Sequence, residues 1–162
     1  LESGELKLDY NKFDIVKLVE DVFEEYDLQA REHGIKLKFA RSAEKSIMVY
    51  ADRKRIQEVL NNLVGNSIKY GKRGGQTEVS FLDMEDNVMI DLTDDGIGIS
   101  EKDLPRIFDR FFRTDKSRSR EMGGTGLGLA IVKHIIEAHN QTINVQSKLN
   151  QGTSFAFTLH KA

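Results

Sequence analysis

The chain lacks the residues on which several kinds of chemistry depend. Its 162 residues include no cysteine, no tryptophan and one proline. Without cysteine there are no disulfides, thiolate metal sites or cysteine nucleophiles, which is compatible with a reducing cytoplasm. No apolar run approaches the roughly 20 residues that a membrane span needs, and no signal peptide is visible. The net charge of −2 gives no general attraction to nucleic acid or to an anionic membrane, so we expect no nucleic-acid partner.

The composition that remains is that of one globular domain. Hydrophobic residues make up 39% and charged residues 31% of a length that suits one sizeable core. Because the chain begins with Leu1 rather than Met, we expect it to be a fragment of a longer protein. Residues 1–12 are polar and irregular, so we expect a linker there, followed by a single domain over residues 13–162.

The sequence pattern predicts three long helices, one short helix and six strands. Apolar residues at helical spacing predict helices over 13–33, 52–70 and 125–139. Gly34 is expected to end the first of these and Asp52 to be the N-cap of the second. A further short helix is expected after Ser100, which would cap it. Alternating patterns predict strands over 35–40, 46–50, 78–84, 88–94, 142–147 and 153–160. This order favours an α/β (α+β) two-layer sandwich, in which a mixed, largely antiparallel sheet of about five or more strands is covered on one face by three helices.

A glycine-rich stretch precedes the last predicted helix. Four glycines fall within the six residues 123–128, and glycine is a poor helix former. Such a density at a helix start allows close approach of the backbone to an anion, where free N–H groups and the helix dipole hold phosphate. A flexible turn is the alternative, and alone it would be preferred. However, a second cluster, Asp94-Asp95-Gly96-Ile97-Gly98-Ile99, lies upstream.

Polar residues on the second predicted helix form a possible cation and phosphate site. Asn62 and Asn66 are four residues apart and share a face, and Lys69 and Tyr70 continue that edge. An amide oxygen is a hard ligand suited to Mg²⁺, and lysine suits phosphate. The alternative is a solvated polar face. Because the opposite stripe is apolar, we expect the asparagines at the edge of the core, where unpaired amides are costly.

Asp94 ends an apolar strand and precedes two glycines. Its carboxylate can accept a hydrogen bond from an exocyclic amine, which adenine offers, while the glycines let the backbone approach a flat base. The alternative is an aspartate that begins a turn.

The segment from Arg106 to Arg120 joins the two glycine clusters. Six basic and two acidic residues give it a local charge of +4, which would complement a triphosphate, and its length indicates a mobile lid. A solvated basic loop is the alternative, which Phe108, Phe111 and Phe112 make less favoured. The four histidines form no hydrolytic or metal-binding grouping.

Together these residues resemble the catalytic, ATP-binding domain of bacterial two-component sensor histidine kinases, a member of the GHKL group of ATPases. Residues 62–70 resemble the N box, 94–98 the first glycine box, 107–113 the F box and 124–129 the second glycine box. The four motifs stand in the family's order, and the resemblance covers about residues 13–160.

The resemblance implies a role for each matching residue. Asn66 would ligate Mg²⁺ with Asn62 in support, Lys69 would approach the phosphates, Tyr70 would pack by the adenine and Asp94 would bind its amine. Asn62, Asn66 and Lys69 are thus the expected catalytic residues. The expected nucleotide contacts are Asn66, Lys69, Tyr70, Asp94, Gly96, Gly98, Ile99, Phe108, Arg113, Lys116, Gly124, Thr125, Gly126, Leu127, Gly128 and Leu129.

The resemblance also implies a reaction and partners. Hydrolytic members of the group resemble one another in a glutamate where this chain has Asn62, so transfer of the γ-phosphate to a protein histidine is favoured over hydrolysis. The acceptor histidine would lie on a dimerisation domain that is missing here, and the parent would be a homodimer that signals to a response regulator receiver domain. We expect a monomeric fragment from the cytoplasmic portion of a membrane-anchored sensor. A hydrolytic GHKL ATPase and a nucleotide-binding regulatory module remain as alternatives.

Overall fold

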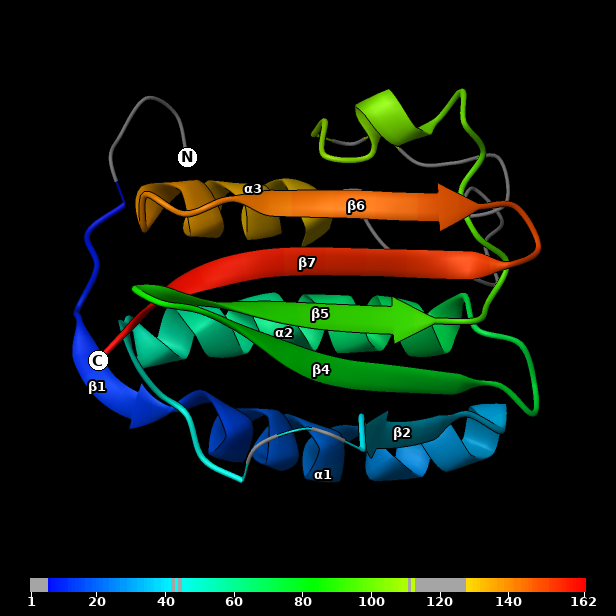
Figure 1. Ribbon diagram of the computed structural model, residues 1–162. Coiled ribbons are helices and arrows are strands. Elements are labelled where there is room, and N and C mark those ends of the chain that lie inside the picture. Colours follow the sequence, from blue (N-terminus) through cyan, green and yellow to red (C-terminus); the bar gives the residue numbers. More distant parts are fainter. Residues whose placement is uncertain (1–5, 42, 44, 111, 113–127) are drawn as a thin grey trace.

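The order of the strands in the sheet differs from their order in the sequence. The computed structural model describes residues 6–41, 43, 45–110, 112 and 128–162, and in this part of the chain a seven-stranded sheet runs β1-β3-β7-β5-β4-β2, with β6 on β7 (Figure 1). The strands are β1 Asn11–Asp14, β2 Lys36–Phe39, β3 Met48–Ala51, β4 Gln76–Met84, β5 Asn87–Asp94, β6 Ile143–Lys148 and β7 Gly152–Lys161. The pairing of β2 with β4 is parallel, and the other pairings are antiparallel.

Three α-helices cover one face of this sheet (Figure 1). They are α1 Ile15–His33, α2 Arg53–Lys69 and α3 Gly128–Ala138, and a 3-10 turn, η1, spans Leu104–Arg106. The expected two-layer sandwich with a mixed, mostly antiparallel sheet is therefore confirmed. None of the helices in the described part of the chain is both long and apolar enough to cross a membrane.

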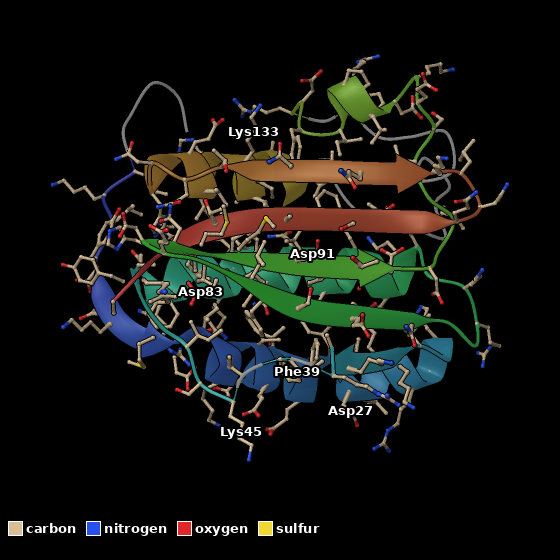
Figure 2. All side chains as sticks on the ribbon, viewed as in Figure 1. Asp27, Phe39, Lys45, Asp83, Asp91 and Lys133 are labelled. Carbon is tan, nitrogen blue, oxygen red and sulfur yellow. The ribbon has the colours of Figure 1, made fainter. Side chains whose placement is uncertain are left out.

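Alternation along the strands places the core between the two layers. Ile90 and Leu92 on β5 and Phe157 on β7 are almost fully buried, and so is Leu60 on α2. The intervening positions, such as Asp91, face the other side of the sheet, which is turned toward the viewer in Figure 2. Asp91 there accepts hydrogen bonds from the hydroxyls of Thr93 and Ser154. The outer face is therefore polar, as a sheet with one solvated face requires.

The helix ends follow their capping residues. Asp14 accepts hydrogen bonds from the N–H groups of Val16 and Lys17, so α1 begins at Ile15 and not at residue 13 as predicted. Gly34 ends α1 with a φ of 70°, and Asp52 caps α2 as expected.

Two local predictions need correction. Asn11 and Lys12, expected in an irregular linker, are paired with β3 in the edge strand β1. Ser100 does accept a hydrogen bond from the Asp103 N–H (3.3 Å), but the next element is the 3-10 turn η1 and not an α-helix. Both segments are short, and the conformation of the first is fixed by its pairing with β3.

Candidate functional site

A row of polar side chains crosses one end of the sheet on the face that the helices cover. Thr77 on β4, Asp94 on β5, Thr153 on β7 and Ser147 on β6 are paired in register. Each lies an even number of residues from the core positions of its strand, so these side chains point toward the helical layer. The apolar core thus gives way to polar groups at this end of the two layers, where a polar ligand could enter.

Asp94 occupies the middle of this row. Its Oδ1 accepts hydrogen bonds from the N–H groups of Gly96 (2.9 Å) and Thr153 (3.3 Å). Among the described residues, no hydrogen bond reaches its Oδ2. Burial raises the pKa of this carboxyl, and the neighbouring charge of Asp95 adds to the effect against the two backbone hydrogen bonds. The side chain is therefore a desolvated acceptor with one oxygen left for a donor.

The second half of α2 carries Asn62, Asn66 and Lys69, and Tyr70 follows as the C-cap of this helix. The amide nitrogen of Asn62 donates to the carbonyl of Glu58 (2.9 Å), which fixes the direction of its Oδ1. A Cβ added at Gly128 would lie 2.7 Å from that oxygen, so the start of α3 lies directly against Asn62. Asn66 follows one turn later on α2 and is half-buried. The Lys69 Nζ lies 5.7 Å from the ring centre of Tyr70.

This donor set fits a magnesium ion that also binds phosphate. Amide oxygens on one helix face supply hard ligands but no full cage, and Mg²⁺ usually keeps several waters and takes further oxygens from a phosphate ligand. In the described part of the chain, no group of three histidine or carboxylate side chains could hold a metal by itself.

The glycines of the first cluster are required by packing. A Cβ at Gly96 would overlap the Tyr70 carbonyl oxygen, and one at Gly98 would overlap the Lys148 carbonyl oxygen. Gly98 also has a φ of 74°. The loop after β5 is thereby fitted between the end of α2 and the β6–β7 turn. Neighbouring backbone therefore fills the space at both Cβ positions, and the expected contact of these glycines with the base stays a prediction.

Phe108 fastens the segment after this loop to the domain. Its ring makes an edge contact with Phe155 on β7 (6.2 Å between centroids), and the Lys133 ammonium of α3 lies 5.6 Å from its centre. Nearby, the Arg106 guanidinium lies 4.5 Å above the ring of Phe112. Phe108 and Phe112 both pack against the hydrophobic core and so anchor this segment to the domain. Lys133 is labelled in Figure 2.

Several predicted site residues lie outside the described residues. These are Arg113, Lys116, Gly124, Thr125, Gly126 and Leu127, together with most of the expected lid. Gly128 and Leu129, at the end of the second glycine cluster, are described and begin α3.

Hydrogen bonds and ring contacts join the start of α2 and the end of α3 to the N-terminal segment. The Asp52 N–H donates to Nε2 of the buried His139 (3.1 Å), and Oδ2 of Asp52 accepts from the Asp9 N–H (2.9 Å). The ring of Tyr10 lies 5.5 Å from that of His139 and 5.1 Å from that of Tyr50. The segment that precedes β1 is thus held at the N-terminus of α2 and at the C-terminus of α3.

The threonines that flank Asp94 were not predicted from the sequence. Thr77 and Thr153 are buried polar residues at strand positions otherwise taken by core residues. Each comes just before an alternating apolar run, Val79-Ser80-Phe81 or Phe155-Ala156-Phe157, in phase with its inward positions. A polar residue in phase with the core at the start of a strand was the available signal.

Comparison with known proteins agrees with this architecture. Residues 51–162 match the family model described as "Histidine kinase-, DNA gyrase B-, and HSP90-like ATPase". The sensor histidine kinase WalK of Bacillus subtilis (strain 168) is 34% identical over 161 residues, which are 98% of this chain and 26% of WalK. The chain therefore spans about a quarter of the length of that relative.

Solved structures give the same assignment. Full-length ShkA in complex with AMPPNP is 29% identical with a TM-score of 0.85, over 98% of this chain and 33% of that one. The nucleotide-free catalytic domain of the histidine kinase ThkA is 30% identical with a TM-score of 0.82, over 95% of this chain and 97% of that one. ThkA solved with the response regulator protein TrrA is 28% identical with a TM-score of 0.78, over 96% of this chain and 42% of that one. The chain belongs to the histidine kinase-, DNA gyrase B- and HSP90-like ATPase family, as a catalytic, ATP-binding domain of the sensor histidine kinase type.

Proposed function

We propose that this domain binds Mg-ATP at the polar end of the sheet and donates the γ-phosphate to a histidine on a dimerisation domain of the same parent protein. The observation that carries the proposal is the placement of Asp94. Asp94 lies on the face of the sheet that the helices cover, at the end of the sheet where α2 ends, and its Oδ2 has no donor among the described residues. Asn62 on α2 lies against the start of α3.

Each residue would act on a different part of the nucleotide. Asp94 would accept a hydrogen bond from the adenine amine, and Tyr70 would pack beside the base. Asn66 would ligate Mg²⁺, with Asn62 in support, and the ion when bound neutralises phosphate charge. Lys69 and the N-terminus of α3 would bind the phosphates. Arg113 and Lys116 of the lid would complete the site, and positioning with charge neutralisation would supply most of the catalysis.

Asn62 favours transfer over hydrolysis. A carboxamide cannot take a proton from an attacking water, whereas a carboxylate at that position could. The amide nitrogen of Asn62 is also committed to the Glu58 carbonyl, so its oxygen is presented as a fixed acceptor.

The partners follow from this reaction. The phosphorylated histidine would pass its phosphoryl group to a response regulator receiver domain, and ThkA has been solved in complex with such a regulator, TrrA. We further propose that the parent is a homodimeric sensor, anchored in a membrane, with this domain on its cytoplasmic side. The isolated domain would be a monomer.

Transfer can be tested with γ-labelled ATP. The chain alone should bind ATP without acquiring label, because none of its histidines lies in an acceptor hairpin. Adding a dimeric hairpin that carries the acceptor histidine, in cis or at high concentration in trans, should yield acid-labile label on the hairpin. Asn62→Glu is the matched variant and should raise ATP hydrolysis. Acid-labile label on the isolated chain would contradict the proposal.

A further inference from the structure

The strand β2 is a free edge of the sheet, beside β4 at one end of the strand order (Figure 1). The Lys36 N–H donates to the carbonyl of Gly75, just before β4 (3.0 Å). Because successive residues of a strand direct their backbone groups to opposite edges, those of Leu37 and Phe39 point away from β4. In the part of the chain that the structure describes, no strand lies beyond them. These backbone groups could therefore pair with a strand of another molecule.

A groove of about 590 Å³ lies beside this edge, between β2 and α1. Four apolar residues in its lining are Phe23, Ala30, Ile35 and Leu37. Leu37 pairs in register with Thr77, so it lies on the face of the sheet that the helices cover. Alternate side chains of an added strand would point to this same face and enter the groove, where apolar side chains would be removed from water.

The opposite face of β2 carries two lysines, Lys36 and Lys38. Lys38 pairs in register with Glu78 of β4, and the Lys38 Nζ lies 3.6 Å from a carboxylate oxygen of Glu78. Lys36 is exposed and, among the described residues, makes no ion pair. A carboxylate on an added strand would lie beside Lys36 as Glu78 lies beside Lys38, and cross-strand pairs of opposite charge stabilise a sheet.

Charge disfavours a second copy of this chain as the added strand. If two β2 strands paired antiparallel with their outer faces in common, a lysine of one copy would lie opposite a lysine of the other, and like charges directly opposite are destabilising. The groove walls of both copies, each with Glu24 and Asp27, would also approach one another. Lysines on edge strands commonly prevent such self-association. The charges therefore favour a different chain, with acidic groups toward Lys36.

We infer that the β2 edge is a docking surface for an extended segment of a partner protein in which acidic residues alternate with apolar ones. The segment adds a strand to β2, its apolar side chains fill the groove, and its carboxylates lie beside Lys36 and Lys38. Glu24 and Asp27 line the groove and so repel acidic residues at the groove-facing positions (Figure 2 labels Asp27). The inference does not involve the nucleotide site, so its outcome is independent of the proposed function.

The test uses short capped peptides and the whole chain, without nucleotide. The probe alternates glutamate with valine, and the control peptide alternates lysine with valine. In NMR titrations the glutamate peptide should bind saturably and slow the exchange of the Leu37 and Phe39 amides, which face the free edge. The lysine peptide should bind roughly fivefold more weakly, as expected for the loss of exposed ion pairs.

One substitution and one modification of the probe test the mode of binding. Lys36→Glu should reverse the preference, so that the lysine peptide binds more tightly than the glutamate peptide. Lys12→Glu makes the same charge change on β1, at the other edge of the sheet, and should leave the preference unchanged. N-methylation of alternate amides of the probe should abolish binding when the methylated set pairs with β2 and should spare binding when the other set is methylated.

Several outcomes would overturn the inference. One is the absence of saturable binding by the glutamate peptide, and another is protection of amides away from β2 only. Equal binding of the two N-methylated probes, or an unchanged preference in Lys36→Glu, would reduce the effect to non-specific attraction. A peptide of the same composition, with its glutamates and valines in separate blocks, should bind more weakly than the probe, and equal binding would contradict the need for alternation.

Discussion

Replacing Asp94 by asparagine can change one atom, Oδ2, while Oδ1 stays an oxygen. The substitution therefore tests ligand recognition separately from folding. The asparagine Oδ1 can still accept the hydrogen bonds from the N–H groups of Gly96 and Thr153, at 2.9 and 3.3 Å in the wild type. The other oxygen, Oδ2, which would accept from the ligand in the proposed function, becomes an NH₂ group, which donates. An adenine amine at this position then meets a donor. A hydrogen bond to a charged group contributes about 1.5–3 kcal/mol, so ATP affinity should fall by roughly ten- to a hundredfold.

Stability should respond to Asp94→Asn in the opposite direction. Burial raises the pKa of Asp94 above its ordinary value of 3.8, so the ionised carboxylate destabilises the fold at pH values above its folded-state pKa. That penalty is relieved as pH falls from the folded-state pKa to 3.8. The variant lacks the ionised group. Its free energy of unfolding at pH 7 should therefore equal or exceed that of the wild type.

Calorimetric titration with ATP and urea unfolding at pH 7 measure the two effects. Asp91→Asn is the control, since Asp91 lies on the same strand but on the outer face (Figure 2). Wild-type ATP affinity should also decline as acid protonates Asp94, whereas that of the variant should stay flat over the same range. Unchanged ATP affinity in Asp94→Asn would place the base elsewhere. A large loss of stability would show that the carboxylate is needed by the fold.

Three further changes test other parts of the structure. Asp14→Ala should lower the free energy of unfolding by about 1–2 kcal/mol, because the cap of α1 and a bond to the Ile47 N–H are lost. Burial raises the pKa of Asp14, but its hydrogen bonds lower it on balance below 3.8, so urea titrations should show the variant's deficit shrinking as pH falls through that lowered pKa. Gly98→Ala forces a side chain to a φ of 74° and against the Lys148 carbonyl, and should lower the melting temperature by several degrees. Asn66→Ala should abolish the difference between ATP titrations with Mg²⁺ and with chelator, and a remaining Mg²⁺ effect would exclude Asn66 as a ligand.

The parts of the fold that depend on local chemistry were predictable from the sequence. Asp52 as the cap of α2, Gly34 as the end of α1 and the β4–β5 hairpin all follow from residues within a few positions of one another. The position of Asp94 at the end of a strand was predictable for the same reason.

Apart from the β4–β5 hairpin, the neighbours of each strand could not be read from the sequence. Thr77, Asp94 and Thr153 are far apart in the chain, and only the pairing of β4, β5 and β7 brings them into one row. The strand β1 was missed because Asn11 and Lys12 are exposed and show no alternation. The reason for Gly96 was also hidden, since the carbonyl of Tyr70 that fills its Cβ position comes from the end of another element.

The edge strand β1 determines how this domain can be shortened for study. It pairs with β3 over Asn11–Asp14, and just before it Asp9 and Tyr10 are held by Asp52 and by His139. A recombinant domain cut at residue 13 would leave the backbone of β3 without half of its partner and would uncover the rings beneath Tyr10. Bare strand edges pair readily with other chains. Such a trimmed domain should aggregate or form dimers through β3, so a clone for binding measurements should begin at or before Leu6.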